Sequence, residues 1–212
     1  GFFLDFLSNL FQGLLTLAYN LTAALGVPNY GTAIIILTVV IKLAMHPLTA
    51  KQVKSLKAMQ ELSPKIKKLQ EKYANDKERL NKELTALYQS SGVNPFSGCL
   101  PLLIQMPVLM GIFFAIRDYN YLQDPPSWFY IADLAKPDPY YVLPVLSALT
   151  TWLMQKQTTT PEASQQNRML MIFMPLFIGY ISFNFPAGLV LYWVVSNIIQ
   201  IGQQWWMFRK TA

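Results

Sequence analysis

Long apolar segments constrain the fold of this 212-residue chain more than any other feature of its sequence. Three windows with few charges lie at Tyr30–Pro47, Phe96–Ile116 and Tyr140–Leu153. A helix needs about 20 predominantly apolar residues to cross the hydrocarbon core of a bilayer. A fourth window, Met169–Phe208, is too long for one span and contains the helix-breaking sequence Asn184–Gly188 (NFPAG), so we divide it into two helices. The pattern predicts five transmembrane helices.

These windows and the polar stretches between them define the expected segments of an all-α integral membrane protein. Transmembrane helices are expected at residues 28–50, 96–117, 139–157, 168–184 and 186–208. The segments between them are expected to be a cytosolic helical hairpin at 51–94, an external loop at 118–138 and a cytosolic loop at 158–167. Residues 1–26 precede the first span and are expected to form an amphipathic helix.

The placement of charge predicts the orientation of these spans. Ten Lys and Arg stand against five Asp and Glu between Lys51 and Asn94, whereas Asp118–Asp138 carries one Lys and four Asp. Cytoplasmic segments carry an excess of basic residues, so the first segment is expected inside and the second outside. Under the same five-span count, four further basic residues also fall inside: Lys156, Arg168, Arg209 and Lys210. The N-terminus is therefore expected outside and the C-terminus in the cytosol, which leaves open that a segment before Gly1 was removed.

The first 26 residues combine a polar stripe with an apolar remainder. The polar side chains fall within about 120° of one helical face; they are Asp5, Ser8, Asn9, Gln12, Thr16, Tyr19 and Asn20. This pattern predicts a helix that lies in the outer membrane interface. The alternative is a sixth, polar-striped span, which would place the N-terminus inside.

The basic segment has the features of two soluble helices. Ser63 and Pro64 are typical of a helix start, with a capping residue before a first-turn proline. Asn75 and Asp76 mark a turn, after which a second helix is expected. We expect an antiparallel hairpin that projects into the cytosol.

A lysine lies inside the first predicted span. Placing Lys42 near the centre of a membrane helix costs roughly 2.5–3.5 kcal/mol on insertion scales, so it requires a compensating interaction. Thr38, Lys42, His46 and Thr49 are spaced by four, four and three residues and share one helical face. No carboxylate lies in any span near the depth of Lys42. The competing interpretation is that Lys42 extends along its helix to the inner surface.

Other predicted spans carry polar stripes of their own. The third contains Ser147, Thr150, Thr151 and Gln155, and the second contains Gln105. The fifth has polar and aromatic residues on less than half its circumference: Tyr192, Trp193, Ser196, Asn197, Gln200, Gln203 and Gln204. Polar groups that faced lipid would lack partners, so the stripes should face one another or water. They predict a hydrated groove, open to the cytosol, with one fixed positive charge; the plainer interpretation of the Ser and Thr residues is that they hydrogen-bond helices together.

Five sequence segments, in this order, resemble the bacterial YidC-type membrane protein insertases of the YidC/Oxa/Alb superfamily. They are TVVIKLAMHPLTAKQ, LSPKIKKLQEKY, GVNPFSGCLPLLIQMPV, DPYYVLPVL and FPAGLVLYWVVSNIIQ. The resemblance covers nearly the whole chain. It implies a protein of the bacterial plasma (inner) membrane that inserts and folds other membrane proteins, without enzymatic activity, cofactor or metal. It also implies partners: nascent membrane proteins, the lipid bilayer, and the Sec translocon, ribosome and targeting factors through the cytosolic hairpin and C-terminus.

The resemblance also implies roles for individual residues. The groove cation of the family, usually Arg, corresponds to Lys42, which keeps the charge but loses the planar, multi-donor guanidinium. The expected substrate groove comprises Lys42, Thr38, His46, Gln105, Gln155, Ser196, Asn197 and Gln200. The expected client-contacting positions are Met106, Pro107, Leu109, Phe185, Tyr192 and Trp193.

Two other function classes can use intramembrane polar stripes. A small-solute transporter or channel subunit is the first alternative, but an odd number of spans and the lack of an internal repeat count against it. An intramembrane enzyme is the second. His46 is the only histidine, and no Asp or Glu lies in the hydrophobic cores, so the sequence has neither a hydrolytic motif nor a metal site.

Overall fold

The computed structural model describes residues 1–94, 100–122, 125–159 and 165–210. Within these ranges the regular structure is helical, apart from one isolated bridge between Trp128 and Ile131. The helices are α1 (Phe2–Ala24), α2 (Tyr30–Ala44), α3 (His46–Glu61), α4 (Ser63–Lys72), α5 (Lys77–Ser91), α6 (Leu100–Arg117), α7 (Val142–Thr158), α8 (Gln165–Ser182) and α9 (Ala187–Lys210). The expected all-α class is confirmed.

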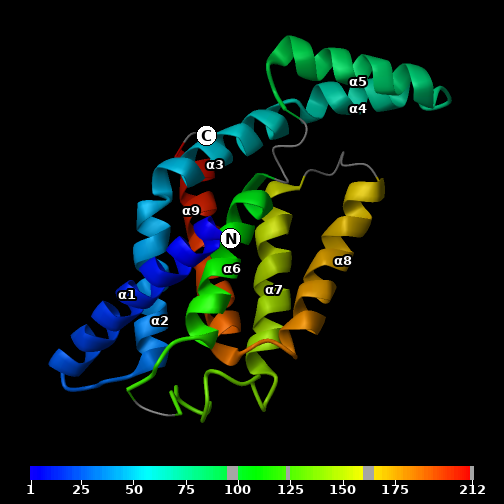
Figure 1. Cartoon of the computed structure of the whole chain (residues 1–212). Coiled ribbons are helices and arrows are strands. Elements are labelled where there is room, and N and C mark those ends of the chain that lie inside the picture. Colours follow the sequence, from blue (N-terminus) through cyan, green and yellow to red (C-terminus); the bar gives the residue numbers. More distant parts are fainter. Residues whose placement is uncertain (95–99, 123–124, 160–164, 211–212) are drawn as a thin grey trace.

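Five helices form the body of the molecule. Figure 1 shows α2, α6, α7, α8 and α9 standing side by side, with α9 among the others. Helix α9 packs against α2, α6 and α7, and α7 packs against α8. The loop after α6 lies at one end of this bundle, while the basic helices α3–α5 and the C-terminus lie at the other end (Figure 1). The acidic and basic segments of the chain are therefore separated by the length of the bundle.

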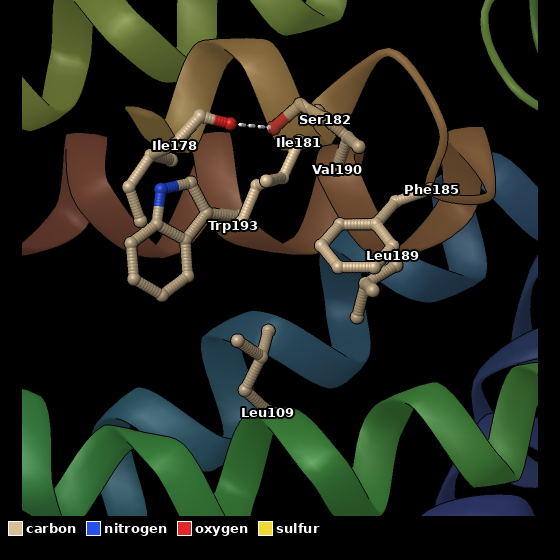
Figure 2. Close-up of a pocket in the computed structure, with 8 residues that line it drawn as sticks. All are labelled: Leu109, Ile178, Ile181, Ser182, Phe185, Leu189, Val190 and Trp193. Atoms are coloured by element: carbon tan, nitrogen blue, oxygen red, sulfur yellow. Dashed lines mark hydrogen bonds between the residues drawn. The ribbon is translucent and has the colours of Figure 1, made fainter. Parts of the chain in front are cut away.

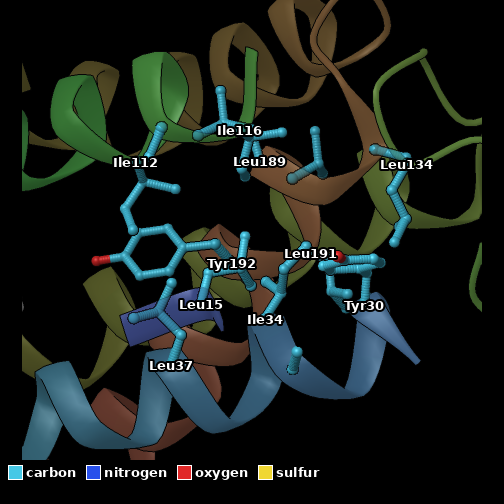
Figure 3. Close-up of a cluster of buried hydrophobic side chains, with 14 of the residues drawn as sticks. Leu15, Tyr30, Ile34, Leu37, Ile112, Ile116, Leu134, Leu189, Leu191 and Tyr192 are labelled. Atoms are coloured by element: carbon cyan, nitrogen blue, oxygen red, sulfur yellow. The ribbon is translucent and has the colours of Figure 1, made fainter. Parts of the chain in front are cut away.

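The apolar core lies where α1, α2, α6 and α9 meet. Figure 3 shows the fully buried Tyr30 and Ile34 of α2 against Leu191 of α9, with Ile112 and Ile116 of α6 beside them. Helix association inside lipid depends on close packing and hydrogen bonds, because lipid tails are as apolar as the side chains. This core fixes α9 against α2, and so fixes the two helices that carry the main polar stripes.

The first predicted span is divided. Helices α2 and α3 meet at Met45 with a bend of 64°, where a continuous helix was expected over residues 28–50. Pro47 accounts for the break, because proline lacks an amide proton and its ring clashes with the carbonyl four residues earlier. By length and composition, α1 could cross a membrane alone, and α2 with α3 could do so together. The apolar parts of α6 and α8, Pro101–Arg117 and Arg168–Ser182, are shorter.

The polar stripe of α1 meets protein over part of its length. Gln12 Nε2 donates to the Ala115 carbonyl (3.2 Å), and the hydroxyls of Thr16 and Tyr119 are 2.6 Å apart. Phe11 of α1 approaches Gly111 of α6, where a larger residue would collide with its ring. Helix α1 therefore leans along α6, and Figure 1 places its N-terminus midway along the bundle. Its outer face exposes apolar side chains: Phe3, Phe6, Leu10, Leu17 and Leu21.

The basic segment forms three helices, because α3 continues as far as Glu61. Helices α4 and α5 pack together as the hairpin. The Asp76 side chain caps α5 by accepting from the Arg79 amide (3.1 Å), and Gly92 ends α5 in the left-handed conformation. The predicted cap at Ser63 is wrong: α4 begins at Ser63, the preceding Leu62 is its N-cap residue, and α4 has no side-chain cap.

Candidate functional site

The centre of the candidate site is the buried amino group of Lys42. Lys42 lies in the last turn of α2 and is 7% exposed. Its Nζ donates a 2.6 Å hydrogen bond to Oε1 of Gln200, a residue of α9 that is also 7% exposed. A hydrogen bond from a charged donor is roughly twice as strong as one between neutral groups. The side chain therefore points into the bundle, toward α9.

The charge of Lys42 is not neutralised by a carboxylate. Within the described part of the chain, the salt bridge joins Arg117 and Asp118, at the opposite end of the bundle. A buried ammonium without an acidic partner is costly, and it attracts any anion or polar group that can reach it. Lys42 thus gives the interior of the bundle one uncompensated positive charge.

A group of glutamines lies in the C-terminal parts of α7 and α9. Five of their buried polar atoms lack a hydrogen-bond partner among the described residues: Gln155 Oε1, Gln157 Oε1, Gln200 Nε2, Gln203 Oε1 and Gln204 Oε1. We call these five residues the glutamine cluster. A buried polar group without a partner costs about 1–3 kcal/mol, so the cluster favours ligands that supply hydrogen bonds. Four of the five partnerless atoms are acceptors, which suit peptide amides or water.

Two of these glutamines also tie helices together. Gln157 Nε2 on α7 donates to the Ile201 carbonyl on α9 (3.1 Å). Gln203 Nε2 on α9 lies 3.1 Å from Nδ1 of His46, at the start of α3. The predicted groove residue His46 is therefore connected to the cluster through Gln203. The polar periodicity of α9 pointed to Gln203 and Gln204, but no sequence signal distinguished Gln157.

The remaining predicted groove residues are satisfied within the protein. Thr38 is fully buried and donates to the Ile34 carbonyl of its own helix (2.7 Å). Asn197 Nδ2 donates to the hydroxyls of Thr150 (3.0 Å) and Thr151 (3.1 Å). Ser196 is buried on α9. For these residues the simpler role, hydrogen bonding between and within helices, describes the geometry.

Helix α6 is tied to α9 by a polar contact. Gln105 Nε2 donates to the hydroxyl of Tyr192 (3.0 Å), whose side chain is fully buried. Figure 3 shows Tyr192 inside the core, between α2 and α6. The structure therefore places Tyr192 away from any surface that a client could touch.

Three of the six predicted client-contacting residues line an apolar pocket between α6, α8 and α9. The pocket is small, with a cavity volume of about 30 Å³, and Leu109, Phe185 and Trp193 line it (Figure 2). Figure 2 also shows the other lining residues: Ile178, Ile181, Ser182, Leu189 and Val190. Met106, one turn before Leu109, is exposed, and Pro107 lies inside α6. These two do not line the pocket, but they lie on the same helix beside it.

Thr151 links the pocket wall to the polar site. Its hydroxyl accepts from Trp193 Nε1 and from Asn197 Nδ2, both at 3.1 Å. Trp193 contributes to the pocket, while Asn197 lies one turn before Gln200 on α9. Sequence reasoning placed Thr151 in a polar stripe but did not identify it as a site residue, because periodicity does not say which neighbour a hydroxyl will meet.

Comparison with known families identifies the chain. Residues 21–212 match the model of a protein family described as "60Kd inner membrane protein". The chain belongs to this family. Membership of this family indicates that the chain is a bacterial inner membrane protein.

Curated relatives of this family member share the name "Membrane protein insertase YidC". The protein of Oleidesulfovibrio alaskensis is 42% identical over 191 residues, which are 86% of this chain and 35% of the relative. The protein of Syntrophus aciditrophicus is 45% identical over 184 residues, 87% of this chain and 34% of the relative. The chain thus spans about a third of the length of the curated relatives it matches.

A solved structure of the same family has a similar fold. It is described as "Active YidC insertase crystal structure with the first transmembrane domain resolved" and superposes with a TM-score of 0.74. The sequences are 27% identical, and the match covers 93% of this chain and 46% of that structure. The arrangement of the helical bundle is therefore shared with an insertase.

Proposed function

We propose that this chain is a membrane protein insertase and chaperone, which inserts client proteins into the bacterial inner membrane and helps them fold. Family membership and the similarity to an active insertase support this function. The observation in this chain that carries it is the buried Lys42–Gln200 pair, a positive charge with no carboxylate partner among the described residues.

In this proposal five segments span the bilayer: α2, α6, α7, α8 and α9. Helices α3–α5 and the C-terminus lie on the cytosolic side, and the loop between α6 and α7 lies outside. The positive-inside rule supports this orientation, since the basic and acidic segments lie at opposite ends of the bundle. Helix α1 is inclined into the outer half of the membrane, with its exposed apolar side chains in lipid.

The polar site would receive the short hydrophilic segment of a client that must cross the membrane. Lys42 attracts acidic groups, and the glutamine cluster offers hydrogen bonds to the peptide backbone of the segment. Each backbone group that enters hydrocarbon without a partner costs several kcal/mol, so partners at this depth lower the barrier to crossing. The site acts as a hydrated groove that opens toward the cytosol.

The client's hydrophobic segment would lie along an apolar wall formed by α6 and α9 at this pocket. Leu109 on α6 and Trp193 on α9 line the pocket, and Met106, exposed beside it, has a flexible side chain that adapts to different sequences. Transfer of an apolar helix from this wall into lipid drives insertion. The membrane potential adds about 2.3 kcal/mol per charge per 100 mV.

The cytosolic elements would bring clients to this site. The α4–α5 hairpin and the C-terminal end of α9 lie at the end of the bundle where a nascent chain arrives. We propose that the ribosome, targeting factors and the Sec translocon contact the protein through these two elements.

Photo-crosslinking to a stalled client tests the function. A photoreactive residue is placed at Leu109 or Met106, and a matched probe is placed at Val145, an exposed residue of α7. A ribosome-bound client with one hydrophobic segment is expected to crosslink at Leu109 and Met106 at least several-fold more than at Val145. Equal crosslinking at all three positions, together with no insertion into proteoliposomes, would contradict the proposal.

A further inference from the structure

The charge of the cytosolic hairpin is concentrated on one of its two helices. Residues 51–72, which include α4, contain seven Lys and two Glu. Residues 77–91, which form α5, contain two Lys, one Arg and two Glu. The excess of positive charge therefore belongs to α4 and the helix before it, whereas α5 is nearly neutral.

Two lysines of α4 form a stripe that points away from α5. Lys65 and Lys68 are spaced by three residues, so they share one helical face, and both are exposed, whereas the Nζ of Lys72 lies over the ring of Tyr73, 5.4 Å from its centre. Ile66, the buried side chain of α4, lies about 130° from the middle of this stripe, taking about 100° per residue. The partner helix lies on the side of Ile66, because Arg79 of α5 lies 5.3 Å from the ring centre of Tyr73, next to Ile66 on the same side.

The hairpin lies across the direction of the spans, with the basic helix on the side nearer to them. Figure 1 shows α4 between α5 and the cytosolic ends of α7 and α8. Since the lysine stripe faces away from α5, it faces the membrane surface at the cytosolic ends of α7 and α8. Among the described residues, Lys65 and Lys68 form no salt bridge with a carboxylate.

We propose that this stripe binds anionic lipid headgroups of the cytoplasmic leaflet and holds the hairpin flat over the ends of α7 and α8. The cytoplasmic leaflet has a negative surface potential that attracts basic residues within a Debye length. RNA would also attract lysines, but it would have to reach a face turned toward the bilayer, while the open face of α5 has balanced charge. The inference relies on the membrane orientation in the proposed function, and its test reads the position of α4 rather than insertion.

The test measures hydrogen exchange of the α4 amides in the full chain, held in lipid nanodiscs. One set of discs contains only phosphatidylcholine, and the other contains about one-third phosphatidylglycerol. Exchange in α4 is expected to slow in the anionic discs by roughly fivefold for each lysine that lies at the surface. The protection is expected to disappear near 1 M salt, where the Debye length falls to about 3 Å.

Two double variants with equal loss of charge locate the effect. Lys65→Gln/Lys68→Gln is expected to lose most of the protection in anionic discs, whereas Lys77→Gln/Lys82→Gln on α5 is expected to keep it. All four side chains are exposed, so both variants should retain the helical circular dichroism of the parent. Equal protection in both kinds of disc, equal loss in both variants, or protection that appears only when ribosomal RNA is added would overturn the proposal. Because no client is present, these outcomes are independent of whether the chain inserts proteins.

Discussion

Lys42 on α2 and Gln200 on α9, 158 residues apart in sequence, form a hydrogen bond of 2.6 Å. The same Gln200 amide has a buried Nε2 without a partner among the described residues. One side of the amide thus fixes the ammonium, and the other remains able to donate to an incoming acceptor. This arrangement holds a positive charge in place without cancelling it.

Gln200→Glu is expected to cancel the charge of Lys42 by placing a carboxylate on it. A charge-assisted hydrogen bond would form in place of the present one, so thermal stability in detergent should stay the same or rise. Insertion of a client with an acidic tail should fall by about tenfold, equivalent to about 1.4 kcal/mol. The measurement is protease protection of the client tail in proteoliposomes.

The control for this variant is Gln89→Glu, which adds the same charge on the exposed surface of α5. It is expected to leave insertion unchanged. If both variants reduce insertion equally, local neutralisation of Lys42 is not the cause.

Thr151→Val is expected to destabilise the protein more than Thr150→Val. The first change removes the acceptor for Trp193 Nε1, which has no other hydrogen bond described, while Asn197 keeps a partner in either variant. An unpaired buried donor costs about 1–3 kcal/mol, so Thr151→Val should lower the free energy of unfolding by that amount and Thr150→Val by under about 1 kcal/mol. Denaturant titration in mixed micelles compares the two; equal losses would contradict the role of Trp193 in this network.

Gly31→Ala is expected to disrupt the end of the bundle where the loop between α6 and α7 packs on α2. A Cβ at Gly31 would overlap the side chain of Trp128, so either the loop or α2 would have to move. Overpacking of this kind costs about 1–3 kcal/mol. Gly202→Ala is the matched control, because nothing lies within 4 Å of its added Cβ; it should be neutral or stabilise α9 by up to about 1 kcal/mol.

A second variant keeps this prediction testable if Gly31→Ala folds poorly. Adding Gly31→Ala to Trp128→Gly should cost little, because the Cβ, Cγ and Cδ1 atoms of Trp128, which the added carbon would overlap, are all absent. If Gly31→Ala is equally harmful with and without Trp128, the close approach does not explain the effect.

The sequence was sufficient to predict the helical class and the two faces that meet at Lys42. The spacing of Thr38, Lys42 and His46 placed them on one side of a helix, and the polar stripe of α9 contained Gln200. Periodicity identifies a face but not its partner, so neither the Lys42–Gln200 bond nor the role of Thr151 could be predicted. The inward position of Tyr192 was missed for the same reason, since a tyrosine suits a core or a surface equally.

Two features of the backbone depend on tertiary context. The sequence contains Pro47, but a proline can either begin a new helix or kink a continuous one, and the local sequence does not distinguish the two. The bend between α2 and α3 is set by the packing of α3. The stripe on α1 was expected to face headgroups. Gln12 and Thr16 instead form hydrogen bonds with Ala115 in α6 and with Tyr119 just after α6. These partners could not be predicted without knowing where α6 lies.

The stability of the loop between α6 and α7 is expected to fall above about pH 10. Loss of hydration at its hydroxyl, and then its hydrogen bond to the Asp138 carboxylate (2.8 Å), raise the pKa of Tyr130 above its ordinary value. In the unfolded chain a tyrosine ionises near pH 10, while the folded hydroxyl stays protonated, so this stabilisation is present below about pH 10 and is lost as the pH rises.

Tyr130→Phe should therefore make the melting temperature depend less on pH between about pH 9 and pH 11. Tyr140→Phe removes an exposed hydroxyl next to it and serves as the comparison. An identical pH dependence in Tyr130→Phe and the parent would contradict this assignment.

Insertion of an acidic-tailed client by position-42 variants tests the central claim most directly. Insertion rates are measured in proteoliposomes for the parent and for Lys42→Arg, Lys42→Gln and Lys42→Glu, with a neutral-tailed client in parallel. If a fixed positive charge receives the client, Lys42→Arg will match the parent, Lys42→Gln will be slower, and Lys42→Glu will be slowest for the acidic tail alone. If Lys42→Glu inserts the acidic tail as fast as the parent does, the charge of Lys42 has no part in insertion and the account is wrong.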